Sequence, residues 1–217
     1  MPAPPAIEAR ELTVELGGRA VLDRVSLAVA PGEKVVVRGE SGSGKSTLLA
    51  TLVGARRPAR GEIRVFGDPL DRFHAPAIRR RTFYMPQEVR PTGEETGREF
   101  VDHLFGFAAT RAARPSPERL REELAAFALD PRLLDARLAT LSGGERQRLA
   151  LVRGLLLERE LMLLDEVTSA VDERGRDRIV ERLLGLEGVA LVAVSHDPEL
   201  AARADRVVEL TAQGGAP

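Results

Sequence analysis

Three short apolar runs, each followed by polar or charged residues, dominate the pattern of hydrophobic positions along the chain. Lys34 to Arg38 contains three consecutive valines, Leu161 to Leu164 is wholly apolar, and Val189 to Val194 forms the third run. Runs of this length without alternation predict strands that are buried on both faces, as in a parallel sheet covered by helices. Because the carboxyl ends of parallel strands meet at one edge, we expect the polar residues after each run to line a ligand-binding edge.

The segment from Ile7 to Val29 has a different pattern, in which β-branched and leucine residues alternate with polar ones and Gly17-Gly18 interrupts them. This pattern predicts antiparallel strands joined in a hairpin. Helical spacing and capping signals predict further elements. These are helices at Ser46 to Val53, Glu99 to Thr110, Glu118 to Leu129 (Ser116 as N-cap, Pro117 first) and Glu145 to Leu157, a helix after Asp197-Pro198, and a strand at Arg206 to Leu210.

The order of these elements predicts an α/β fold within a single domain of residues 1–217. Its core of 7–87 and 141–210 would hold a mainly parallel sheet and N-terminal antiparallel strands, with an α-helical subdomain inserted at 88–140. The ends, 1–6 and 211–217, are expected to be tails.

Composition excludes several classes of function. The chain has 32 basic and 33 acidic residues, so its net charge of −1 provides no overall field for nucleic acid or anionic lipid. It contains no cysteine, which excludes disulfides, thiolate metal sites and a cysteine nucleophile. No apolar run approaches the roughly 20 residues of a membrane span. We therefore expect a cytoplasmic protein that does not bind nucleic acid.

Lysine occurs only at Lys34 and Lys45, whereas 30 basic residues are arginine (32 − 2 = 30). A lysine in so arginine-rich a chain indicates a place that needs a compact ammonium group. Lys45 is such a place. Lys34 is expected to be an exposed charge at the entrance of a strand, and the run Arg79-Arg80-Arg81 a solvated surface.

Lys45 belongs to a glycine-rich loop between a predicted strand and a predicted helix. The loop satisfies the pattern G-x-x-x-x-G-K-[ST], which predicts the phosphate-binding loop of a P-loop NTPase. Its glycines let successive N–H groups point at a phosphate, Lys45 would reach the β- and γ-phosphates, and the Ser46 hydroxyl would ligate Mg²⁺. The residues are Gly39, Glu40, Ser41, Gly42, Ser43, Gly44, Lys45, Ser46 and Thr47.

Polar side chains at the ends of the other two apolar runs complete a candidate site. Asp165 would hold Mg²⁺, and Glu166, on the opposite side of the pleat, would polarise an attacking water. His196 ends the third run. Ser195-His196-Asp197 is not interpreted as a hydrolase triad, because neighbours in a strand face opposite ways. His74 and His103 are expected to be surface or packing residues.

The stretch Leu141 to Arg148, which reads LSGGERQR, resembles the signature of the ATP-binding cassette family. Other motifs of that family follow in order. Gln87 resembles the Q-loop glutamine, Ser169 to Asp172 resembles the D-loop, and His196 resembles the switch histidine. From the residues themselves, Ser142-Gly143-Gly144 would open an amphipathic helix, with N–H groups and a hydroxyl available at its positive end as a second anion site.

The resemblance implies a RecA-like core and a head-to-tail homodimer. In such a dimer each ATP lies between the phosphate loop of one copy and Ser142, Gly143, Gly144 and Asp172 of the other. It implies that Glu166, His196, Lys45 and Gln87 are catalytic and that Ser46, Gln87 and Asp165 hold Mg²⁺. It further implies an ATPase on the inner face of the cell membrane that drives separate transmembrane permease subunits. The alternative is a non-transport cassette, such as an iron–sulfur cluster assembly ATPase.

The chain departs from the family where adenine would stack. No aromatic residue occurs before Phe66, and Val14 or Leu16 occupies the expected region. We therefore expect weaker discrimination between ATP and GTP than is usual in the family.

Overall fold

The protein is described by a computed structural model that covers residues 3–107, 110–169 and 171–211. The chain divides into two compact units. The first unit lies within Met1–Tyr84, Glu160–Glu166 and Glu187–Pro217, and the second within Met85–Arg159 and Val167–Leu186. Each is described by itself.

The first unit contains an antiparallel sheet with the strand order β2-β1-β4-β5. Strand β1 (Ile7–Leu16) pairs with β2 (Arg19–Val29) and with β4 (Arg60–Val65), and β4 pairs with β5 (Asp68–Pro69). The turn between β1 and β2 is formed by Gly17 and Gly18, both with positive φ. The hairpin predicted for 7–29 is therefore present.

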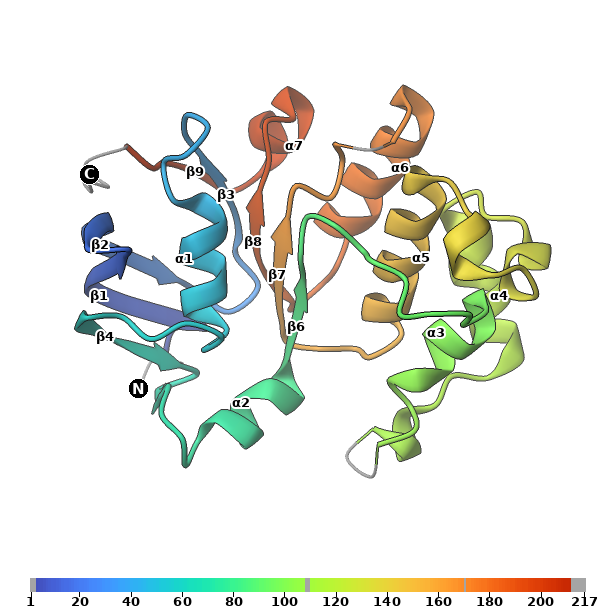
Figure 1. Ribbon diagram of the computed structural model, residues 1–217, viewed down its shortest axis with the longest axis horizontal. Helices are drawn as coiled ribbons and strands as arrows, with labels where there is room; N and C mark the ends of the chain where they lie inside the picture. The colour runs from blue at the N-terminus through green and yellow to red at the C-terminus, as the bar shows by residue number, and fades with distance from the viewer. Residues whose placement is uncertain (1–2, 108–109, 170, 212–217) are drawn as a thin grey trace. The chain divides into compact units, whose positions relative to one another are not determined.

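The first unit also contains the predicted parallel sheet, with the order β6-β7-β8-β3-β9. Strand β8 (Ala190–Val194) lies between β7 (Leu161–Asp165) and β3 (Lys34–Arg38), and β9 (Arg206–Glu209) follows β3. Strand β6 (Thr82–Met85) forms the other edge. Helices α1 (Lys45–Leu52), α2 (Ala75–Arg81) and α7 (Pro198–Arg203) complete the unit (Figure 1).

One apolar core joins both sheets of the first unit to α1. It includes Ile7, Leu22, Val35, Leu48 and Val192, all fully buried. All five residues of β7 and of β8 are buried, as expected for central strands covered on both faces. Their carboxyl ends are thereby held at one edge.

The second unit is helical. It contains α3 (Gly97–His103), α4 (Pro117–Ala126), α5 (Gly143–Leu155), α6 (Glu173–Leu184) and short 3₁₀ turns at Arg111–Ala113, Pro131–Leu134 and Leu138–Thr140. Helix α5 packs against α3 and α4. The unit therefore includes more residues than the insertion expected at 88–140, because the apolar side of α5 is buried in it.

Three helices differ from the sequence prediction. The helix expected at Glu99 to Thr110 begins earlier, after the capping box of Thr96 with Glu99, and ends at His103. Beyond it the chain turns around Gly106, and residues 108–109 lie outside the described part. Helices α2 and α6 were not predicted. Most residues of α6 are charged, which hides its helical spacing.

Lys34 is not the exposed charge that the sequence suggested. Its residue is 7% exposed, and Nζ donates to the carbonyls of Gly32 at 2.9 Å and Val189 at 2.6 Å. Burial lowers the pKa of its ammonium group, an effect that Asp205 opposes. Lys34 therefore ties the start of β3 to the start of β8.

Two further expectations are corrected by packing. Ala6, expected within a tail, is fully buried, and its carbonyl accepts from Phe66 N at 3.2 Å. Arg81 is not merely solvated, since it forms two 2.7 Å hydrogen bonds to Glu160 and stacks on the Phe66 ring. The tail expected at 211–217 lies, beyond residue 211, outside the described residues.

Candidate functional site

The loop between β3 and α1 has the backbone shape that phosphate binding requires. Gly39, Gly42 and Gly44 all have positive φ, at 150°, 82° and 96°. A Cβ on Gly39 would lie 2.3 Å from the carbonyl oxygen of Leu210, and one on Gly44 would lie 2.8 Å from a Leu22 methyl group. The positive φ favours glycine at all three positions, and at Gly39 and Gly44 there is also no room for a Cβ.

The loop surrounds two groups that would contact phosphate, the Lys45 ammonium and the Ser43 hydroxyl. Lys45, the first residue of α1, is 7% exposed, and its Nζ donates to the carbonyls of Gly39 at 2.8 Å and Glu40 at 2.9 Å. The Ser43 hydroxyl is buried and has no hydrogen-bond partner among the described residues. The loop thus positions an ammonium and an unpartnered hydroxyl beside the N-terminus of α1, where anions are favoured.

Asp165, at the carboxyl end of β7, fits a magnesium site. The residue is 2% exposed, and its Oδ1 has no hydrogen-bond partner among the described residues. Burial raises the pKa of Asp165, while a hydrogen bond from Ser46 and the charge of Lys45 act in the opposite direction. A divalent cation held by Ser46 Oγ and Asp165 would offset this desolvation, and both donors are the hard oxygens that Mg²⁺ prefers.

Glu166 turns away from Asp165 and toward His196. Its φ of 49° bends the chain directly after β7, and its N–H donates to the Val194 carbonyl at 2.9 Å. Its Oε1 lies 4.0 Å from Nε2 of His196, which is too long for a direct hydrogen bond. The His196 side chain is 61% exposed and that of Glu166 is 23% exposed. The two groups therefore face the same accessible space at the sheet edge.

The neighbours of His196 have structural tasks, as the sequence predicted. Asp197 caps α7 by accepting from Glu199 N at 2.8 Å and Leu200 N at 3.1 Å, while Ser195 Oγ accepts from Asp197 N at 3.0 Å. Sequence reasoning missed Arg38, whose Nη2 donates to the Asp197 carbonyl at 3.0 Å. The only signal in the sequence was a charged residue at the end of an apolar strand.

The second unit contains the signature residues at the start of α5. Ser142 is the N-cap and forms a capping box, in which its hydroxyl donates to Glu145 Oε2 at 2.7 Å and accepts from Glu145 N at 3.2 Å. The bond from the Ser142 hydroxyl to the Glu145 carboxylate, together with one from the Ser142 N–H at 2.8 Å, lowers the pKa of Glu145. The Ser142 hydroxyl is therefore hydrogen-bonded to Glu145. The residues Ser142 and Gly143 are exposed to solvent, and Gly144 is half-buried.

Two other predicted residues belong to the second unit. Asp172 caps α6 by accepting from Gly175 N at 3.1 Å. Gln87 is exposed and follows β6. Ala170, within the predicted D-loop, lies outside the described residues. The structure thus brings Lys45, Ser46, Asp165, Glu166 and His196 together in the first unit.

Of the two residues considered near the adenine position, Val14 is 1% exposed and packs in the core. Leu16, at the end of β1, is half-buried.

Comparison with known proteins identifies what the chain is similar to. Residues 22–169 match the family described as ABC transporter. The chain is 40% identical over 217 residues to the ABC transporter ATP-binding protein RamB of Streptomyces coelicolor, covering 96% of this chain and 34% of that protein. It is 37% identical to the zinc import ATP-binding protein ZnuC of Cereibacter sphaeroides, covering 93% of this chain and 77% of that protein. It therefore spans about a third of RamB and most of ZnuC.

Solved structures give the same result. The chain is similar to the ATP-binding cassette MJ0796, in a dimeric post-hydrolysis structure bound to ADP and Pi. The TM-score is 0.83 with 27% identity, and the match covers 96% of this chain and 95% of that one. The P-loop NTPase α/β fold expected from the sequence is thus confirmed.

Proposed function

We propose that this chain, which belongs to the ABC transporter family, is an ATP-hydrolysing subunit that drives a membrane transporter. The observation that carries the proposal is the grouping of the phosphate loop, buried Asp165 and the Glu166–His196 pair at one edge of the parallel sheet. Such a grouping supplies phosphate binding, cation binding and water activation together.

The phosphate loop would hold the triphosphate. Lys45 would exchange its two carbonyl partners for β- and γ-phosphate oxygens, and the buried Ser43 hydroxyl would gain a partner. Loop N–H groups and the N-terminus of α1 would add further donors. Mg²⁺, when bound, would supply positive charge that offsets the charge of the phosphates. Ser46 and Asp165 would hold it.

Glu166 would orient the attacking water and accept its proton. The 4.0 Å separation from His196 leaves both groups able to contact a molecule that is placed beside them. His196 would contact the γ-phosphate and the same water, which fixes the line of attack. Arg38 supports this loop through the Asp197 carbonyl.

The second half of each site would come from another copy of the chain. Ser142, Gly143 and Gly144 expose the first N–H groups of α5, a 13-residue helix whose dipole favours an anion there. The Ser142 hydroxyl would leave Glu145 and donate to the γ-phosphate of the partner copy, and Asp172 would lie near the same junction. Two identical sites formed in this way close into a dimer.

The substrate pathway would belong to separate transmembrane subunits. No helix among the described residues is long and apolar enough to cross a bilayer. As the ATPase subunit of a transporter, the protein would lie on the inner face of the membrane, bound to permease subunits. The relatives include both importers, such as ZnuC, and an exporter. The match to the probable iron export ATP-binding protein FetA of Escherichia coli covers 97% of this chain and 93% of that protein at 29% identity.

The proposal is tested by Glu166→Gln, which keeps the shape of the side chain and removes the base. ATP hydrolysis should fall by at least a hundredfold, because general-base contributions are typically 10²–10⁴-fold, while ATP should now trap a dimer in size-exclusion chromatography. Glu187→Gln, an exposed acid before β8, is the matched control and should hydrolyse ATP at the parental rate. Parental hydrolysis by Glu166→Gln would show that another group is the base.

A further inference from the structure

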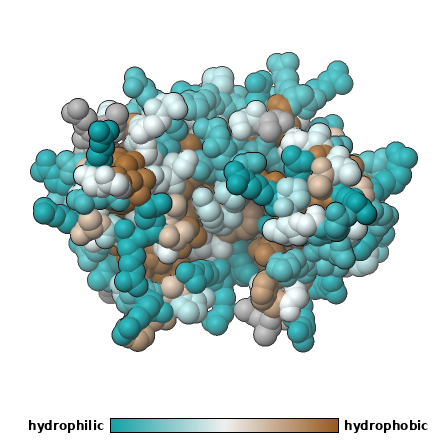
Figure 2. Space-filling model, viewed as in Figure 1, coloured by the Kyte–Doolittle hydropathy of each residue, from teal (hydrophilic) through white to brown (hydrophobic). Residues whose placement is uncertain are grey.

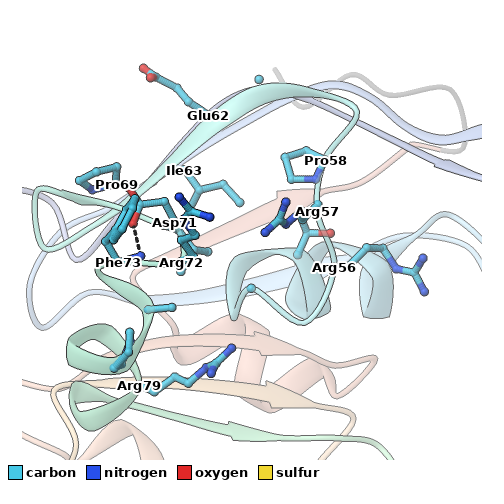
Figure 3. A pocket seen from close by; sticks show the side chains of 16 residues that line it. Arg56, Arg57, Pro58, Glu62, Ile63, Pro69, Asp71, Arg72, Phe73 and Arg79 are labelled. Atoms are coloured by element: carbon cyan, nitrogen blue, oxygen red, sulfur yellow. Dashed lines mark hydrogen bonds between the residues drawn. The ribbon is translucent and has the colours of Figure 1, made fainter.

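A second concave site lies in the first unit, separate from the phosphate loop. Its cavity has a volume of about 800 Å³ and is lined by residues between Thr51 and Arg79, none of which belongs to Gly39–Thr47. The walls come from the end of α1 with the loop after it, from β4, and from the segment that leads into α2 (Figure 3). The volume is within the range of ligand sites, about 300–1,000 Å³.

Arginine dominates the charge of this cavity. Its lining contains Arg56, Arg57, Arg72 and Arg79. Figure 3 shows that Arg57 and Arg79 extend from opposite walls toward the cavity, whereas Arg56 points away from it. No hydrogen bond or ion pair joins the side chain of Arg57 or of Arg79 to another described residue.

The two carboxylates in the lining are committed elsewhere. Asp71 accepts hydrogen bonds from the backbone N–H groups of Phe73 at 2.8 Å and His74 at 2.9 Å, and its Oδ1 lies 2.9 Å from the His74 ring. These bonds, led by the one from His74, lower the pKa of Asp71. Glu62 Oε1 lies 3.6 Å from Nη1 of Arg10 on β1. The cavity arginines are therefore left without a neutralising partner among the described residues.

Helix α2 provides an internal contrast. Arg81 is held in place by Glu160 and by the Phe66 ring, with its guanidinium carbon 3.7 Å from the ring centroid. Arg79, two residues earlier, faces the cavity and has no such partner. The basic run on this helix therefore has one structural arginine and one that is available to a ligand.

Phe73 adds an apolar surface to the same cavity. The residue is 73% exposed, the highest value among the large hydrophobic residues that the structure describes. The face drawn in Figure 2 is mostly hydrophilic, with separate apolar patches. The Arg72 guanidinium lies over the Phe73 ring at 4.6 Å. A cation stacked on an aromatic ring offers a flat, amphipathic contact.

We propose that this cavity binds a phosphate-bearing ligand that also has an apolar part. Guanidinium groups bind phosphate oxygens in pairs, and Arg57 and Arg79 would clamp one phosphate from two sides. Phe73 would cover the apolar part. The ligand is either a soluble phosphodiester or a phospholipid head group, which share this chemistry. The proposal does not depend on ATP hydrolysis.

The test uses the full chain and two probes. Vesicles of phosphatidylglycerol, with phosphatidylcholine vesicles for comparison, are assayed by flotation, and bis(4-nitrophenyl) phosphate, a soluble phosphodiester with aromatic parts, by calorimetry. The test variant is Arg57→Gln/Arg79→Gln. The control is Arg111→Gln/Arg178→Gln, which removes the same charge from exposed positions of the second unit. ATP hydrolysis by both variants should equal that of the parent, which checks folding.

Binding should weaken at least tenfold in the test variant and less than twofold in the control, because charge-assisted hydrogen bonds exceed the roughly 1.4 kcal/mol of a tenfold change. Binding of bis(4-nitrophenyl) phosphate identifies a soluble ligand, and binding of phosphatidylglycerol vesicles alone identifies a lipid. Arg57→Lys/Arg79→Lys should recover part of the affinity. Absent binding to both probes, or equal losses in both variants, would overturn the proposal.

Discussion

Glu123 is a buried carboxylate clamped by two arginines within the second unit. Its side chain is 2% exposed, and it accepts from Arg182 Nη2 at 2.6 Å and Nε at 3.3 Å, while Arg119 Nη2 lies 2.9 Å away. The contact joins α4 to α6, the helix that Asp172 caps. We predict that Glu123→Gln destabilises the second unit and impairs ATP-dependent pairing of two chains.

The size of the effect follows from the burial of the three groups. Removing one partner of a buried ion pair costs about 3–5 kcal/mol, because the other charge is left uncompensated. Here the side chains of Arg182 and Arg119 are 30% and 44% exposed, so both recover some water. The expected loss is therefore near the lower end, about 3 kcal/mol, which corresponds to a fall in Tm of roughly 6–12 °C for a chain of this size.

Thermal and urea unfolding, followed by circular dichroism, measure this loss. Glu122→Gln on the same helix is the control. The Glu122 side chain is 69% exposed and lies 3.8 Å from Arg119, and such a long, exposed ion pair contributes less than about 1 kcal/mol. Equal losses in the two variants, or a Glu123→Gln protein within about 1 kcal/mol of the parent, would refute the reasoning.

Three further predictions concern the first unit. Gly39→Ala should abolish nucleotide binding and lower stability by about 2–4 kcal/mol, since its Cβ would lie 2.3 Å from the Leu210 carbonyl oxygen. Gly42→Ala would place its Cβ in open space and should cost only about 1–2 kcal/mol, for its positive φ. Equal losses of stability in denaturant titration would contradict this. Lys34→Met should cost about 1–3 kcal/mol at pH 7 because two carbonyls lose their donor. Burial lowers the folded-state pKa of Lys34 below 10.5, so the unfolded lysine holds its proton more tightly. The free energy of unfolding of the parent should therefore rise relative to that of Lys34→Met as pH increases from the folded-state pKa to 10.5. A difference that shrinks with rising pH would contradict this. Competition binding should find less than hundredfold preference for ATP over GTP, about 2.7 kcal/mol, and Leu16→Tyr should increase that preference.

The phosphate site could be predicted because its signals are local. The spacing of the glycines with Lys45 and Ser46 specifies a backbone shape and two ligands within nine residues. The position of Asp165 and Glu166 followed from an apolar run and the geometry of a parallel sheet. The N-caps at Ser116 and Asp197 were likewise predicted from neighbouring residues, and both are present.

Contacts between distant residues could not be predicted in this way. Lys34 donates a hydrogen bond to the Val189 carbonyl, 155 residues away, and Arg81 donates to Glu160, 79 residues away. Helix α6 presents only a few buried apolar residues among charged ones, so tertiary packing determines it more than periodicity does. The helix after Thr96 was predicted too long, because apolar residues continue past His103 although the chain turns at Gly106.

The central claim is that two copies of the chain enclose two nucleotides, each bound by the phosphate loop of one copy and the α5 terminus of the other. A crystal structure of Glu166→Gln with Mg-ATP tests it most directly. The account predicts Ser142 Oγ of one copy within hydrogen-bond distance of a γ-phosphate oxygen bound to the Lys45 loop of its mate. A nucleotide-bound structure in which Ser142 lies far from every γ-phosphate would contradict it.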